Sequence, residues 1–226
     1  MWIIGAPRLQ CADSLIAPVV PDQPSASPRR PLEPGGLERA RRVVTLAWAD
    51  LPKAERRLLA SVGADAWEVV DQPLGGHAHE LLISSGSMPL STAARRDIDR
   101  AVGVWIGELR LVLIDAGHHA LALLDQETYE MMLARTAWHE WAHALSVHRA
   151  EARDVADGAR LLDLAPPGVA AIVRGGGYRR GEYTHEIVAE VYALLMLRRL
   201  YGAAGKPSWL DDEIYNLVRR VSGWTD

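Results

Sequence analysis

The chain has 226 residues, of which 49% are hydrophobic and 24% are charged, a composition typical of a globular domain. A net charge of -4 lacks the basic excess of nucleic-acid binders, so no nucleic-acid partner is expected. The single cysteine, Cys11, excludes an intramolecular disulfide and favours a cytoplasmic location. The longest apolar run, near Ile187–Leu197, contains Glu190 and is too short to span a bilayer, so no membrane role is expected.

The N-terminal residues differ from the rest of the chain. Seven of the thirteen prolines fall within residues 1–36, and this stretch has no sustained hydrophobic periodicity. We therefore predict a Pro-rich, poorly ordered arm over 1–36 and one domain over 37–226.

The first part of the domain contains two helical patterns and one strand pattern. Apolar spacing predicts helices over Leu37–Ala49 and Lys53–Ser61. Trp67–Val70 has the composition of a short strand. Gly75 and Gly76 are then expected to break the chain.

The clearest strand signal precedes the longest helical pattern. Glu108–Asp115 alternates between polar and apolar residues, and His119–Leu124 is a second apolar run. The three residues 116–118 between them predict an antiparallel hairpin. A long helix is expected over Gln126–His148.

The C-terminal half is expected to be mainly helical. Gly175–Gly177 is interpreted as a flexible loop, and Thr184 as the cap of a helix that continues to Tyr201. A last helix is expected over Ser208–Val221. Together the elements predict an α+β fold, with a small antiparallel or mixed sheet packed on the long helix.

A His-Glu-x-x-His pattern occupies positions 139–143 of this long helix. Residues four apart on a helix share a face, with β-carbons about 5–6 Å apart. Both imidazoles can then reach one Zn²⁺, at about 2.0–2.1 Å each. The pattern predicts His139 and His143 as zinc ligands, and the alternative is a histidine pair on an exposed face.

Glu140 follows the first of these histidines, beside the metal but turned aside. There its carboxylate can hold the water at the open zinc position. Zinc lowers the pKa of that water to about 7, so a carboxylate can take its proton at neutral pH. Glu140 is therefore the predicted general base.

With uncharged residues around it, the motif resembles that of the zincin metallopeptidases. The resemblance implies a hairpin and an edge strand before the active-site helix. The metzincin subgroup does not fit, because Ser146 and Arg149 stand at the positions of its glycine and its third histidine. His148 is one residue out of place and is interpreted as a surface or helix-end histidine.

The gluzincin subgroup, which takes its third ligand from a later helix, fits better. Glu186 and Glu190 are four apart in an apolar stretch, where burial is costly without compensation. The resemblance implies Glu186 as third ligand and Glu190 as the acid that orients His139 through its other ring nitrogen. The reverse assignment stays open, as does the possibility that both glutamates are solvated. His185 is a competing ligand, but it projects about 100° away around the helix.

The His-Glu-x-x-His and Glu-x-x-Ala-Glu pair is also similar to small zincin domains of antirestriction-type proteins and repressor-cleaving metallopeptidases. This resemblance covers roughly residues 105–202, and residues 1–104 match no family in this way.

Tyr178 and Tyr183 are candidate donors to a tetrahedral oxyanion. Trp138 and Trp141 are expected to fill the core or the cleft wall. No role is assigned to the remaining candidate histidines, which are His77, His79, His118 and His119.

These residues predict a zinc-dependent metallopeptidase that acts on a peptide or protein substrate. Two alternatives are kept. One is a regulatory or nucleic-acid-associated protein that has a zincin fold without proteolysis. The other is a helical interaction domain without a metal.

Overall fold

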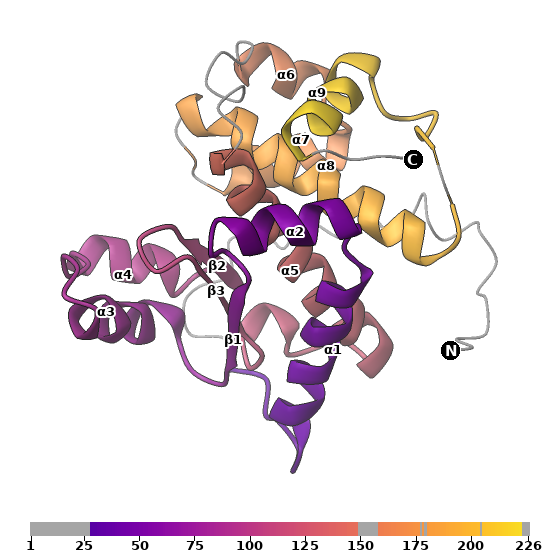
Figure 1. Cartoon of the computed structure of the whole chain (residues 1–226). Helices are drawn as coiled ribbons and strands as arrows, with labels where there is room; N and C mark the ends of the chain where they lie inside the picture. The colour runs from indigo at the N-terminus through magenta and orange to yellow at the C-terminus, as the bar shows by residue number, and fades with distance from the viewer. Residues whose placement is uncertain (1–27, 149–157, 177, 179, 204, 223–226) are drawn as a thin grey trace.

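The computed structural model describes residues 28–148, 158–176, 178, 180–203 and 205–222 (Figure 1). Residues 1–27 of the predicted arm, with Cys11, lie outside the described residues. So does Gly177 of the predicted flexible loop, whose first residue, Gly175, ends a helix.

The chain has the predicted α+β class, and helices dominate it. The helices are α1 (Gly36–Asp50), α2 (Lys53–Ser61), α3 (Leu74–Ser84), α4 (Thr92–Ile98), α5 (Gln126–His148), α6 (Gly158–Leu164), α7 (Pro167–Gly175), α8 (Tyr183–Leu200) and α9 (Asp212–Ser222). Two short 3₁₀ helices are η2 (His119–Leu121) and η4 (Arg180–Glu182). The strands are β1 (Ala66–Val70), β2 (Gly103–Ile106) and β3 (Leu111–Asp115). The prediction of α2 and α5 is confirmed at both ends.

The three strands form one small mixed sheet in the order β1-β3-β2. β3 is central, parallel to β1 with Ala66 opposite Leu111, and antiparallel to β2 with Gly103 opposite Ile114. The sheet is therefore mixed, which is one of the two forms predicted, antiparallel or mixed. Its β2 edge becomes important at the candidate site.

The predicted hairpin between Glu108–Asp115 and His119–Leu124 is wrong. β3 already has a neighbour on each side, and the hairpin turn lies before it, where Arg110 adopts a left-handed φ of 51°. The second apolar run forms η2 instead, in which the His118 Nδ1 accepts a hydrogen bond from the Ala120 N–H at 3.2 Å. Within this run Leu121 is buried in the core, whereas Leu123 is exposed.

The predicted chain break at Gly75 and Gly76 is also wrong, because both lie in α3. Gly75 permits a close approach between helices, since a β-carbon there would lie 2.1 Å from the Arg95 carbonyl oxygen of α4. Its N–H donates to Asp99 Oδ1 at 2.7 Å. The glycine thus marks tight helix packing, which a sequence pattern does not distinguish from a break.

The main core lies where α5 is packed between α1, α8 and the sheet. Trp138 and Trp141 are fully buried, which confirms that they fill the core, and the Trp138 indole N–H donates to the Ala47 carbonyl at 2.9 Å. Figure 1 shows α3 and α4 on the other side of the sheet from α1, with α6, α7 and α9 around α8. A helix that is apolar on most of its surface is expected to be enclosed in this way, as α8 is.

The described residues of the predicted arm contact the domain. The Arg29 guanidinium donates to both carboxylate oxygens of Asp115 at 2.6 Å. The Arg30 backbone N–H donates to the Gly117 carbonyl at 2.9 Å, and its guanidinium lies over the Tyr129 ring. Residues just before α1 are therefore anchored to the end of β3 and the start of α5.

Candidate metal centre

The candidate site is built along the contact between α5 and α8. α5 presents Arg135, His139 and His143 at intervals of four residues, and α8 presents Glu186 and Glu190 at the same interval. Arg135 pairs with Glu190, whereas His143 pairs with Glu186, so the two helices run in opposite directions here. The result is a ladder of alternating basic and acidic side chains between two largely apolar helices.

Three side chains of this ladder face one another with their donor atoms. The His139 and His143 Nε2 atoms are 3.0 Å apart. Glu186 Oε2 lies 3.6 Å from His139 Nε2, and Glu186 Oε1 lies 3.5 Å from His143 Nε2. Ligands at about 2.0–2.1 Å from a tetrahedral zinc ion are separated by about 3.3–3.4 Å. The observed separations bracket this value.

The chemistry of the three residues also suits a divalent cation. In the described part of the chain they form the one group of three His, Cys, Asp or Glu donors whose ligand atoms lie within 4.8 Å of one another. Glu186 Oε2 is buried without a hydrogen-bond partner, which is costly for a carboxylate oxygen. Catalytic zinc sites can have two imidazoles and one carboxylate as protein ligands, with the fourth position of the ion left open. The residues present therefore fit such an ion, and their assignment as ligands stays a prediction.

Glu190 contacts the far side of His139. Its Oε1 lies 3.3 Å from His139 Nδ1, and its Oε2 accepts from the Arg135 guanidinium. Although burial raises the pKa of Glu190, the charge of Arg135 and the contact with His139 outweigh burial and hold it at about 2. An ionised Glu190 keeps the Nδ1 proton in place, so that Nε2, which faces Glu186 and His143, is the ring nitrogen left to bind an ion. Arg135 is a site residue that the sequence reasoning missed.

The two histidines differ in their affinity for protons. Burial lowers the pKa of His139, but the close carboxylates of Glu186 and Glu190 outweigh burial and raise it to about 10. Burial lowers the pKa of His143 to about 4, and the neighbouring His139 charge adds to this effect. Without a cation, the pair therefore holds its extra proton on His139.

Glu140 lies beside this group at the edge of the sheet. It is 7% exposed, and burial raises its pKa to about 7, although the charge of His139 opposes the rise. The backbone N–H of Trp105 in β2 donates to its carboxylate. A carboxylate with a pKa near neutrality is well matched to general-base catalysis at that pH.

Gly103 of β2 makes this close approach possible, and the sequence reasoning missed it as well. A β-carbon at position 103 would lie 2.5 Å from Thr136 Cγ2 and 3.1 Å from Glu140 Cγ. Any other residue would push α5 or the Glu140 side chain away from β2. The glycine at the start of a short apolar stretch was the available signal.

The two candidate oxyanion donors are placed differently. The Tyr178 hydroxyl donates to Glu186, which puts it at the site, and burial raises its pKa well above the ordinary value. The ring of Tyr178 packs over Gly176, where a β-carbon would lie 2.3 Å from a ring carbon. This contact gives the Gly-rich segment a role that its sequence did not reveal. Tyr183 begins α8, and its β-carbon lies close to Gly158 of α6.

The remaining histidines are outside the donor group. His185 affects His143 through its charge but contributes no donor atom to the cluster. His148 is the last residue of α5. His77 pairs with Glu68 at 3.2 Å, and His118 caps η2. His79 of α3 and His119 of η2 are likewise absent from the donor group.

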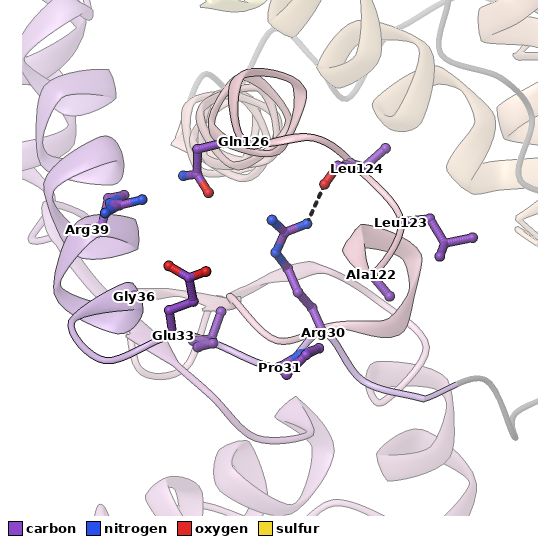
Figure 2. Close-up of a pocket in the computed structure, with 10 residues that line it drawn as sticks. Arg30, Pro31, Glu33, Gly36, Arg39, Ala122, Leu123, Leu124 and Gln126 are labelled. Atoms are coloured by element: carbon purple, nitrogen blue, oxygen red, sulfur yellow. Dashed lines mark hydrogen bonds between the residues drawn. The ribbon is translucent and has the colours of Figure 1, made fainter.

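One cavity among the described residues is not part of this site. It has a volume of about 430 Å³ and lies between the residues before α1 and the start of α5, with Arg30 pointing into it (Figure 2). Gln126 on its wall lies about 20 Å along the α5 axis from His139. The Arg30 guanidinium already donates to the carbonyls of Leu121 and Leu124, at 2.8 and 2.7 Å. A smaller cavity of about 190 Å³ borders β2.

No helix of the described residues is both long enough and apolar enough to cross a bilayer. Comparisons of the chain with protein-family models, curated proteins and solved structures gave no match. The interpretation of the site therefore depends on its own geometry.

Proposed function

We propose that the protein is a zinc-dependent metallopeptidase with a zincin-like active site. The observation that carries the proposal is the cluster of His139, His143 and Glu186, whose facing atoms lie 3.0, 3.5 and 3.6 Å apart, with the Glu140 carboxylate beside it. A structural metal site has no need of an adjacent base. The nearness of Glu140 therefore favours hydrolysis over a purely structural or regulatory role.

Each residue of the site has a distinct task in this proposal. His139, His143 and Glu186 would hold the ion, which supplies Lewis-acid polarisation of a carbonyl and acidifies water. Glu140 takes a proton from water and passes it to the leaving amine. Tyr178 donates a hydrogen bond to the developing oxyanion once Glu186 no longer accepts from it.

The edge of β2 offers the place for a peptide substrate. Asp115 N–H donates to the Val102 carbonyl, so hydrogen-bonded pairs of this antiparallel ladder fall at positions 102, 104 and 106. The backbone groups of Gly103 and Trp105 therefore point away from β3. An extended peptide can add to such an edge through main-chain hydrogen bonds. The Trp105 N–H, which contacts Glu140, brings that edge to the site.

The test combines metal analysis with peptide hydrolysis. We expect purified protein to hold one zinc ion and to cleave an unstructured protein such as casein in a reaction that chelator abolishes. Glu140→Gln should retain zinc and lose activity by several orders of magnitude, because the base is removed while the ligands remain. His139→Ala should lower zinc occupancy.

Two results would contradict the proposal. If Glu140→Gln cleaved casein as fast as the wild type, Glu140 would not be the base. If the wild type bound zinc but no chelator-sensitive cleavage appeared with casein or a random peptide library, the regulatory alternative would replace the peptidase.

A further inference from the structure

The cavity of about 190 Å³ beside β2 is almost wholly apolar. It is lined from α3 by Leu82, from the following loop by Met88 and Leu90, and from α4 by Ile98. Its other wall is β2, with Val104, Trp105 and Ile106, and Glu108 is its one charged lining residue. Figure 1 shows α3 and α4 beside β2, on the side of the sheet away from α1.

This cavity reaches the same strand edge that leads to Glu140. Val104 and Ile106 pack with the α3 side of the sheet, whereas Gly103 faces Thr136 and Glu140 on α5. Trp105 packs with the α5 side and still lines the cavity. The cavity is lined by residues from both faces of β2, so it reaches the outer edge of that strand, where the backbone groups of Gly103 and Trp105 point away from β3.

The size and lining of the cavity select its occupant. Pockets for small-molecule ligands measure about 300–1,000 Å³, so this one is too small for a drug-sized compound. It suits a single large apolar side chain. Met88, which is 87% exposed, stands at the wall as a flexible side chain that can close over different apolar groups. The exposed Glu108 disfavours an acidic occupant.

We propose that this cavity is a specificity pocket for one leucine, methionine or phenylalanine side chain of an extended peptide paired with β2. The inference rests on the proposed peptidase function and names its substrate class. Side chains of adjacent strands that lie opposite one another share a face of the sheet. The peptide residue opposite Val104 or Ile106 therefore enters the pocket, and its immediate neighbour faces Glu140 on the α5 side.

Binding is tested separately from cleavage, in zinc-loaded Glu140→Gln protein. The probes are ten-residue Ser/Thr peptides with one central Leu, Ala or Glu. The methionine methyl groups are labelled with ¹³C, and the Met88 signal is assigned with Met88→Leu. We expect the Leu peptide to shift the Met88 signal saturably, and the Ala and Glu peptides to shift it much less. A Met88 signal that no Leu peptide moves overturns the pocket, whether or not the wild type cleaves peptides.

Cleavage gives the second readout, with Ile83→Asp as the matched control. Ile83 is 53% exposed on α3 next to Leu82 but does not line the cavity. For active enzyme we expect kcat/KM to be at least about tenfold higher for the Leu peptide than for the Ala peptide. Met88→Asp should reduce this ratio severalfold, while Ile83→Asp leaves it unchanged. If the enzyme is active but does not prefer the Leu peptide, or if Met88→Asp leaves that preference intact, the pocket is refuted while the peptidase proposal stands. A Met88 shift without Glu140-dependent cleavage supports the pocket and contradicts the peptidase proposal.

Discussion

Arg135→Met is the substitution that most directly tests the buried ladder between α5 and α8. It removes the cation that pairs with Glu190 and leaves a side chain of similar length. The Glu190 side chain is 7% exposed, so its charge would lose the guanidinium in an interior position and keep only the protonated His139 as a close cation. Removing one partner of a buried ion pair is more destabilising than the pair itself is stabilising.

The structure gives the magnitude of this effect. The pKa of Glu190 is about 2, against an ordinary value of 4.5. One pKa unit corresponds to about 1.4 kcal/mol, so the folded protein favours the ionised form by about 3 kcal/mol. Because this pKa is lowered in the folded state, the contribution is complete above pH 4.5 and is lost as the pH falls toward 2. Arg135 is the largest of several causes that lower this pKa, so at pH 7 we expect Arg135→Met to cost up to about 3 kcal/mol, which for this chain length is a fall of up to about 12 °C in Tm.

The assay is urea unfolding of zinc-free protein at pH 7, arranged as a double-mutant cycle. In the Glu190→Gln background, Arg135→Met should cost only about 1 kcal/mol, since no buried carboxylate then loses its partner. Arg160→Met is the control, because Arg160 pairs with Glu213 at 2.7 Å with an exposed side chain, and such pairs contribute about 0–1 kcal/mol. Equal costs of Arg135→Met in both backgrounds would refute the coupling between Arg135 and Glu190.

Two further predictions concern the edge of the sheet and the proton on the histidine pair. Gly103→Ala should lower kcat by more than tenfold with unchanged zinc content, because its methyl group would displace Glu140, and Thr136→Ser should partly restore kcat by removing Cγ2. Wild-type kcat in Gly103→Ala would contradict the close approach. Zinc binding at pH 8 should release at least one proton, because His139 has a pKa of about 10 without the ion, whereas Glu140 at about 7 is already ionised. Calorimetry in two buffers of different ionisation enthalpy measures this proton, and identical heats in both buffers would contradict the prediction.

The local features of this protein were predictable from the sequence. The bounds of α2 and α5 follow from apolar spacing and flanking residues, and both were predicted correctly. The separation of His139 from His143 is fixed by the pitch of one helix, as is that of Glu186 from Glu190. Interactions within three or four residues of a helix depend on few other parts of the chain, so a sequence pattern is enough to expect them.

The strand pairing required the tertiary structure. The apolar alternation of Glu108–Asp115 identified a strand, but its partners come from β1 and β2 rather than from the apolar run that follows. The residues that cover the faces of a strand and pair with its edges are distant in the chain. Local alternation therefore does not specify which strand will be its neighbour. The role of Gly75 also required the tertiary structure. The sequence predicted a chain break there, but Gly75 lies within α3 and packs against α4.

At the site, the residue types came from the sequence and their relative positions from the fold. Two histidines and two glutamates at helical spacing indicated metal chemistry, yet the sequence left the order of Glu186 and Glu190 open. The antiparallel packing of α5 on α8 places the Glu186 carboxylate opposite both Nε2 atoms and Glu190 against Nδ1 of His139. Arg135 and Gly103 became recognisable only through contacts across the fold, because no spacing within the chain links either of them to the carboxylate it touches.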